Sequence, residues 1–279
     1  MIFSNRSANV MRNIRKDIFS ETIKCIRPED SKIGVYVSGG IDSSILLANL
    51  VEISKILNFE VIALSADFGM EKNECEYQEH LAKYYGVDFI RVPIEKLFIG
   101  LPEILSIFDR PQFNIWPFFL AAEAINQGIL NVFIGEGADE IFGGYHIKGY
   151  REAWVDSIEY IQRAYYAVND FFDIKTSMPY VNLDWRKYLG IHCNPYKYAL
   201  RRAFKGELPD FVMNRESAPP LYTRYLELWQ REFAPYISWT IPKTNEEARR
   251  AIRIEMAYIW ATNKRLGKTA SMIEVAEDD

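Results

Sequence analysis

One stretch of the sequence decides how the chain folds: Val35 to Leu50, which reads VYVSGGIDSSILLANL. It joins an apolar run at residues 33–37 to an apolar helical pattern at residues 43–57. Residues 38–44, which form the turn and the start of the helical pattern, include two glycines, one aspartate and three serines, with no lysine among them. Glycine lets a backbone approach a ligand closely and adopt a positive φ. We expect a buried strand, a tight turn and a helix whose N-terminus faces that turn.

The same alternation of strand and helix continues along the first half of the chain. Prolines and glycines, such as Pro28 and Gly86, separate the segments. The predicted helices are residues 10–27, 43–57, 73–86 and 116–128, and the predicted strands are residues 33–37, 60–67, 87–94 and 130–137. The strands are apolar throughout, as strands with both faces covered are. The pattern predicts an α/β fold with a parallel sheet of about five strands and helices on both faces.

Beyond about residue 150 helical periodicity dominates, and prolines break it into pieces. We therefore expect one domain over residues 1–279, with an α/β core at residues 28–150 and a mostly helical region at residues 151–279.

The composition of the chain limits the class of protein to which it can belong. Hydrophobic residues make up 49% of the 279 residues and charged residues 25%, as in a soluble globular protein. The net charge of −5 argues against a broad nucleic-acid interface. Cys25, Cys75 and Cys193 have neither zinc-ligand nor redox spacing, which indicates free thiols in a reducing compartment. No apolar run is long enough to span a membrane and no signal-peptide pattern is present, so we expect a cytoplasmic location.

The first glycine turn has the composition of an anion site. In an open parallel sheet, ligands bind beyond the carboxyl ends of the strands, where the turn SGGIDSS should lie. Serine hydroxyls and the N-terminus of the next helix suit phosphate. The sequence lacks the spacing of a Walker loop or a dinucleotide loop here. Asp42 would repel phosphate unless Mg²⁺ lies between them. The alternative is a tight turn in which an aspartate or serine caps the helix.

A second motif, IGEGADEIFGGYHIKGY at residues 134–150, follows the fourth predicted strand and should open at the same edge of the sheet. It carries Glu136, Asp139 and Glu140 among glycines. We predict that Asp139 joins Asp42 as a second carboxylate for Mg²⁺, and that Glu136 acts as a general base or acid. The alternative is a solvated acidic loop.

These motifs carry a resemblance to a known family. The turn SGGIDSS resembles the pyrophosphate-binding loop of the N-type ATP pyrophosphatases, the PP-loop superfamily. GEGADEIFGGY resembles the signature of the synthetase domain of glutamine-hydrolysing asparagine synthetase, and FDRPQFNIWPFFLAAEA at residues 108–124 resembles the segment before it. MPYVNLD and LPDFVMNRES are weaker likenesses. The resemblance implies an adenine nucleotide alpha hydrolase-like fold, with residues 28–150 binding nucleotide and residues 151–279 on the substrate side.

The resemblance also implies a chemistry. Enzymes of this family bind ATP and Mg²⁺, adenylate a carboxylate, release pyrophosphate, and let an amine displace AMP to form an amide. Glu136 matches the family glutamate that serves the acyl-adenylate, where the related β-lactam synthetases have a tyrosine; this favours intermolecular amidation. The implied pyrophosphate ligands are Ser38, Gly39, Gly40, Asp42, Ser43 and Ser44, the Mg²⁺ ligands Asp42 and Asp139, and the adenosine contacts Val37, Leu64, Ile134 and Gly135.

Three positions depart from the family pattern. Residue 2 is Ile2, whereas the family's glutaminase half begins with a nucleophilic cysteine, so we expect free ammonia, another amine or a separate glutaminase subunit to supply nitrogen. The place of the family's catalytic lysine falls at Ser217, and Arg215, Lys175 or Lys268 are the cations that would replace it. Lys175 also stands near the family's acceptor-side acid, so the acceptor pocket should differ from one for aspartate.

The leading prediction is an ATP-dependent, AMP-forming amide ligase for small-molecule carboxylates and amines, with a role in amino-acid biosynthesis. Two alternatives stay open: a tRNA-modifying PP-loop enzyme, and a degenerate module that binds nucleotide without turnover. Ser217 favours the degenerate module, whereas the intact Asp42, Glu136 and Asp139 oppose it. We expect no membrane partner and no nucleic-acid partner, and the sequence leaves a homo-oligomer open. His146 has a surface or packing role in this interpretation.

Overall fold

The computed structural model describes residues 2–68, 74–94, 101–109, 115–143, 162–188, 197–215 and 243–266. Ser217, Lys268, His146 and Cys193 lie outside these residues. The chain divides into two compact units, Met1–Pro93 with Leu120–Ser217, and Ile94–Phe119 with Ala218–Asp279. The two units are described separately below, and the single domain expected from the sequence stays a prediction.

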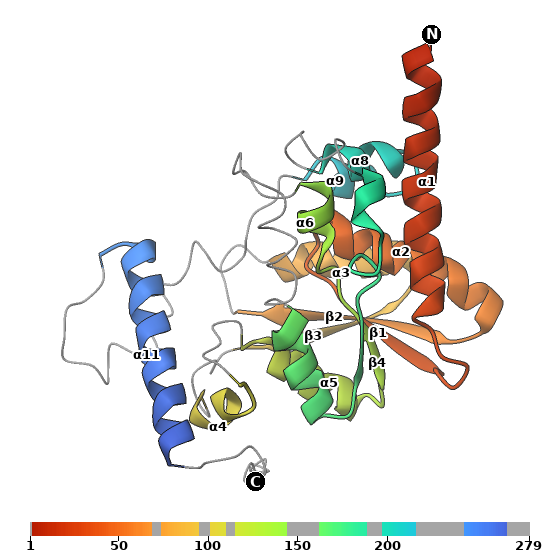
Figure 1. Ribbon diagram of the computed structural model, residues 1–279. Coiled ribbons are helices and arrows are strands. Elements are labelled where there is room, and N and C mark those ends of the chain that lie inside the picture. Colours follow the sequence, from red (N-terminus) through yellow and green to blue (C-terminus); the bar gives the residue numbers. More distant parts are fainter. Residues whose placement is uncertain are drawn as a thin grey trace. The chain divides into compact units, whose positions relative to one another are not determined.

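The first unit is built on a five-stranded sheet in the order β3-β2-β1-β4-β5, and every pair of neighbours is parallel (Figure 1). The predicted parallel sheet of about five strands is therefore confirmed. Its strands are β1 (Lys32–Tyr36), β2 (Glu60–Asp67), β3 (Asp88–Pro93), β4 (Asn131–Phe133) and β5 (Lys175–Ser177). The predicted strand at residues 130–137 is thus longer than β4, because its last residues form a turn.

Helices cover both faces of this sheet (Figure 1). On one side lie α1 (Ile2–Lys24), α2 (Ile41–Leu57) and α3 (Glu74–Tyr85), and on the other lies α5 (Pro117–Asn126), together with a helix at residues 162–171. The short helices that the structure also describes in this unit are α6 (Ala138–Phe142), η1 (Trp185–Tyr188), α8 (Tyr198–Ala203) and α9 (Asp210–Met213).

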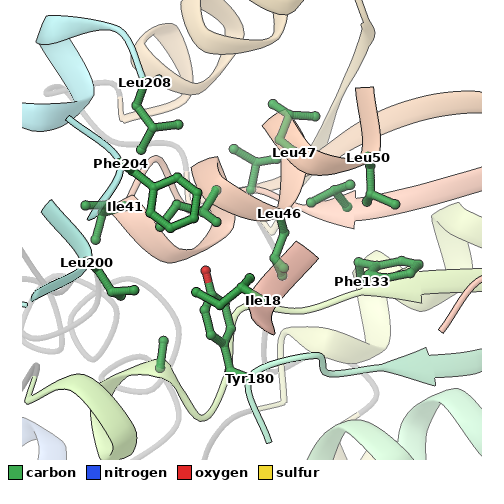
Figure 2. Packing of buried hydrophobic residues seen from close by; sticks show 14 of the residues in the cluster. Ile18, Ile41, Leu46, Leu47, Leu50, Phe133, Tyr180, Leu200, Phe204 and Leu208 are labelled. Atoms are coloured by element: carbon green, nitrogen blue, oxygen red, sulfur yellow. The ribbon is translucent and has the colours of Figure 1, made fainter. Parts of the chain in front are cut away.

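The core of the first unit lies between α1, α2 and one face of the sheet. Ile18 of α1 and Leu46 of α2 are fully buried there (Figure 2). Val35 of β1 is fully buried in the same cluster. Successive residues of a strand face opposite sides, so Gly34 and Tyr36 face the α5 layer instead. A methyl group on Gly34 would lie 3.0 Å from Leu64 Cδ1, so the second face is also closely packed.

A polar network holds strand β5 in the sheet and lies near the amino ends of β4 and β5. Asn131 Nδ2 donates to the Cys25 carbonyl oxygen at 3.1 Å and to Asp30 Oδ2 at 2.6 Å, and Ser177 Oγ donates to Asn131 Oδ1 at 2.7 Å. Lys175 Nζ donates to the same Cys25 carbonyl. Buried polar groups with these partners stabilise the strand order. Lys175 therefore lies at the amino end of the sheet, opposite the edge at which phosphate is predicted.

The second unit contains α4 (Leu101–Ser106) and α11 (Asn245–Arg265), which pack against each other. Trp260 Nε1 donates to the Phe108 carbonyl oxygen at 3.0 Å. Thr244 caps α11 by accepting a hydrogen bond from the Glu247 amide at 3.2 Å. Among the described residues, no helix combines the length and apolar character that crossing a bilayer requires.

Replacement of a core leucine tests the packing of α2. We expect Leu46→Ala to lower the free energy of unfolding by about 2–5 kcal/mol, since Leu46 is 0% exposed and its truncation leaves a cavity. Ile56→Ala in the same helix is the matched control, because Ile56 is 76% exposed and its change should stay within about 0.5 kcal/mol. Urea unfolding followed by circular dichroism measures both; equal losses would contradict this packing.

Candidate active site

The turn after β1 is closed by its own serines. The Ser38 amide donates to Ser43 Oγ at 3.2 Å, the Gly40 amide donates to Ser38 Oγ at 3.3 Å, and Ser44 Oγ donates to the Gly40 carbonyl at 2.8 Å. Gly39 has a φ of +72°, which favours glycine. Gly40 is the N-cap of α2, and within the described residues no side chain caps this helix. The alternative of an aspartate or serine N-cap is therefore wrong.

Arg215 lies over this turn. Its guanidinium carbon is 4.2 Å from the centre of the Tyr77 ring, and its Nη1 is 3.5 Å from the Ser38 carbonyl oxygen. A methyl group on Gly39 would lie only 2.2 Å from Arg215 Nη1. Arg201 Nη2 donates to the Arg215 carbonyl at 3.0 Å and so holds the backbone at Arg215 in place. The structure thus brings Arg215 to the predicted phosphate turn.

The turn after β4 packs directly against the turn after β1. A methyl group on Gly135 would lie 3.2 Å from Asp42 Cβ and 3.2 Å from the Ser43 nitrogen, so any side chain here would push the two turns apart by a few tenths of an ångström. Gly137 follows with a φ of +91° and begins α6, which carries Asp139. The strand order changes direction between β1 and β4, which is where open α/β sheets bind ligands.

Lys197 joins the two turns and was not predicted from the sequence. Its Nζ contacts Asp42 Oδ2, and it lies 2.7 Å from Asp139 Oδ1. The Lys197 side chain is 12% exposed, and the side chains of Asp42 and Asp139 are 15% and 38% exposed. Lys197 directly precedes α8, far from both aspartates in sequence. The structure therefore supplies a cation at Lys197, and the hypothesis that Lys175 supplies it is wrong.

Burial and neighbouring charge determine how Asp42 and Lys197 titrate. Burial and the nearby Asp139 raise the pKa of Asp42 to about 6, although Lys197 opposes them. Burial lowers the pKa of Lys197, but the two carboxylates outweigh burial and leave that pKa above its ordinary value. The ammonium of Lys197 therefore stays charged. Among the residues that the structure describes, Asp42 Oδ1 has no hydrogen-bond partner.

Glu136 lies in a neighbouring half-buried position. Tyr165 OH donates to Glu136 Oε1 at 3.2 Å. Burial, followed by repulsion from Glu140 and Asp139, raises the pKa of Glu136 to about 7. A carboxylate with a pKa near neutrality is suited to general acid–base chemistry.

A hydrogen bond to the sheet fixes the position of Tyr165. Asn169 lies one turn along the same helix, and its Nδ2 donates to Thr176 Oγ1 of β5 at 2.7 Å. Residues four apart lie on one face of a helix, so Tyr165 and Asn169 both face inward. No sequence motif marked Tyr165, because this contact joins segments far apart in the chain.

The predicted adenosine contacts lie close together: Val37 follows β1, Leu64 lies within β2 next to it, and Ile134 follows β4. The Val37 amide donates to the Leu64 carbonyl at 2.8 Å, and the Ile134 amide donates to the Ser177 carbonyl at 3.0 Å. The side chains of Val37, Leu64 and Ile134 are at most 3% exposed, so they pack in the core. Their contact with adenosine, like that of Gly135, stays a prediction.

The residues present fit a divalent cation and a polyphosphate. Asp42 and Asp139 come from two strand ends and converge on one positive centre, and Asp42 Oδ1 is still available. Carboxylate oxygens are the protein ligands that Mg²⁺ prefers, with phosphate oxygens completing its shell. Groups of three or more His, Cys, Asp or Glu that would hold a metal by themselves are absent from the described part of the chain.

Known proteins are similar to this chain in sequence. Over 142 residues the chain is 30% identical to asparagine synthetase (glutamine-hydrolyzing) 1 of Bacillus subtilis (strain 168), which covers 49% of this chain and 22% of that protein. It is 34% identical over 136 residues to the 7-cyano-7-deazaguanine synthase of Thermoplasma acidophilum, covering 42% of this chain and 55% of that protein. The matched region is thus about a fifth of the asparagine synthetase relatives' length.

A solved structure and a family model complete the comparison. The U34-tRNA thiolase NcsA from Methanococcus maripaludis matches 93% of this chain and 79% of its own chain, with a TM-score of 0.45 and 16% identity. Residues 16–189 match the family model described as asparagine synthase. Because this match takes in both glycine turns and well over half of the chain, the protein belongs to the asparagine synthase family.

Proposed function

We propose that this protein is an ATP-dependent ligase that adenylates a carboxylate and transfers an amine to it. The observation that carries the proposal is the meeting of Asp42 and Asp139 beside the glycine turn at residues 38–40, with Glu136 next to them. Members of its family use ATP. Release of AMP and pyrophosphate, the use of Mg²⁺, and a role in amino-acid biosynthesis are parts of this proposal.

The phosphate end of ATP would lie against the turn after β1. Gly39 and Gly40 leave the backbone open to close approach, and the free N–H groups and positive end of the seventeen-residue helix α2 face the same place. Arg215 and Lys197 add positive charge on either side. Asp42 and Asp139 would hold Mg²⁺, which neutralises the charge that develops on pyrophosphate as it leaves.

The reaction has two steps in this proposal. A carboxylate oxygen of the acceptor attacks the α-phosphorus of ATP, the bond to the bridging oxygen of the β-phosphate breaks, and pyrophosphate leaves. The nitrogen of ammonia or another amine then attacks the acyl carbon, and AMP leaves with the bonding electrons. Glu136 would accept the proton that the attacking nitrogen loses, because its pKa of about 7 lets it bind and release a proton near neutral pH.

Nitrogen supply, partners and location are also proposed. Free ammonia, another small amine or a separate glutaminase subunit would supply nitrogen, and the substrates would be small molecules handled in the cytoplasm. The acceptor is a carboxylate of unspecified structure.

One observation favours a second candidate. Because the relative from Thermoplasma acidophilum is a 7-cyano-7-deazaguanine synthase, a PP-loop enzyme of modified-nucleoside or tRNA chemistry is the alternative. The net charge of −5 opposes direct tRNA binding. A degenerate module is opposed by the assembled carboxylates.

One assay separates these functions. The protein is incubated with ATP, Mg²⁺, ammonium and a panel of carboxylic acids, and pyrophosphate is measured. Release that depends on one acid supports the ligase, whereas release that depends on tRNA supports the alternative. Binding of ATP without pyrophosphate release under any of these conditions supports the degenerate module and contradicts the ligase.

Each of the two aspartates should be required for Mg²⁺-dependent turnover. We expect Asp42→Asn and Asp139→Asn each to lower Mg²⁺-dependent turnover by about 100-fold or more, since each change removes a charged ligand. Asp88→Asn is the matched control, because Asp88 is exposed at the start of β3. Circular dichroism checks that all three variants fold. Wild-type turnover in either active-site variant would refute its metal role.

Glu136→Gln should separate activity from stability. The folded protein holds the Glu136 proton up to about pH 7, above the ordinary carboxyl pKa of 4.5, so the stability from that proton is lost as the pH rises. We therefore expect Glu136→Gln to abolish turnover and to raise the melting temperature at pH 8 more than at pH 5. Thermal denaturation of both proteins at the two pH values measures this. An equal change in melting temperature at pH 5 and pH 8 would contradict the proposed burial of the Glu136 charge.

Tyr165→Phe should change the pH dependence of turnover. The Tyr165 hydroxyl stabilises the ionised form of Glu136, so its loss raises the pKa of Glu136. The acidic limb of the rate profile should move to higher pH, while Tyr166→Phe, a change at an exposed neighbour, leaves the limb in place. Superimposable profiles for the two variants would exclude this role of Tyr165.

A further inference from the structure

Lys197 occupies the point on which the two proposed metal ligands converge. Its Nζ contacts Asp42 Oδ2 and lies 2.7 Å from Asp139 Oδ1. Those oxygens cannot hold an ammonium and a divalent cation in the same place. We propose that Lys197 is an internal counter-cation that keeps Mg²⁺ out of the nucleotide-free site, so that metal and nucleotide enter together. This inference rests on the proposed function, since it assumes that Asp42 and Asp139 bind the metal.

The site needs a positive charge before any ligand arrives. Asp42 and Asp139 lie close enough to share one ammonium, and Glu136 and Glu140 are near them. Carboxylates gathered at low exposure repel one another and lose hydration. The Lys197 ammonium offsets both effects and so stabilises the close packing of the two turns at Gly135.

Displacement of this ammonium by free Mg²⁺ should be energetically unfavourable. Mg²⁺ gives up its hydration water reluctantly and takes only one or two carboxylates from most proteins. The displaced ammonium, whose side chain is 12% exposed, would lose two charge-assisted contacts and gain no anion. ATP changes this balance, because its phosphates offer the ammonium a new anionic partner beside the turn at residues 38–40.

The backbone around Lys197 allows such a movement of the side chain alone. The Lys197 amide lies 3.4 Å from the Gly143 carbonyl oxygen, and the Arg201 amide donates to the Lys197 carbonyl at 3.0 Å. Leu200 of α8 is fully buried and holds the helix in the core. The lysine side chain has four rotatable methylene groups, so its Nζ can move from the carboxylates to a phosphate while the main chain stays in place.

The test measures metal binding without turnover. Mn²⁺, which substitutes for Mg²⁺ and is detected by electron paramagnetic resonance, is titrated into the nucleotide-free full chain. We expect Lys197→Met to bind Mn²⁺ at least about tenfold more tightly than the wild type, because the carboxylates lose their internal cation. Lys205→Met is the matched control: it removes the same charge from an exposed position and should behave as the wild type. Equal Mn²⁺ affinity in all three proteins would overturn the inference.

A measurement on the wild type does not depend on the folding of a variant. A non-hydrolysable ATP analogue should raise the Mn²⁺ affinity of the wild-type site at least about tenfold, after correction for Mn²⁺ bound by the analogue itself. Tight Mn²⁺ binding without the analogue would contradict the inference but leave the ligase proposal standing. Absence of Mn²⁺ binding even with the analogue would overturn both, and lack of ligase turnover alone would overturn only the proposed function.

Discussion

The contact between the two glycine turns is the constraint on which the site depends. At Gly135 the backbone after β4 lies so close to Asp42 and Ser43 that a side chain there would force these neighbours to shift by a few tenths of an ångström. This approach brings together carboxylates from the first turns of the two helices that follow β1 and β4, although Asp42 and Asp139 are 97 positions apart in the sequence. A parallel sheet makes such a meeting available because the carboxyl ends of neighbouring strands share an edge. The sheet places the two turns at the same edge, and Gly135 lets them approach each other closely.

That closeness has an electrostatic cost, and the surrounding residues offset it in different ways. Lys197 neutralises the aspartate pair, whereas Tyr165 donates one hydrogen bond to a glutamate that still has a raised pKa. A protein selected only for stability would not gather these acids at low exposure. The arrangement is therefore of the kind that functional sites maintain against the stability of the fold.

Sequence reasoning reached the sheet and the two motif turns because their signals are local. Apolar runs and glycine positions predict strands and turns without knowledge of the rest of the chain. β5 escaped prediction because it has only three residues, two of them hydroxylic and one a lysine. Lys197 and Tyr165 escaped because only tertiary contacts bring them to the site. Lys175 was misplaced for a related reason: its sequence neighbourhood resembled an active-site segment, while its side chain binds the Cys25 carbonyl at the opposite end of the sheet.

Two of the cations near the glycine turn, Lys197 and Arg215, lie in the described stretch of residues 197–215. Arg201 ties the far end of this stretch back to its start by hydrogen bonds to Met213 and Arg215 carbonyls. Asp42 and Asp139 come from the helices that follow β1 and β4, whereas Lys197 and Arg215 come from this later part of the chain. A change in the position of this stretch would move the charges of Lys197 and Arg215 together. The charge balance of the site therefore depends on a part of the chain that lies outside the sheet.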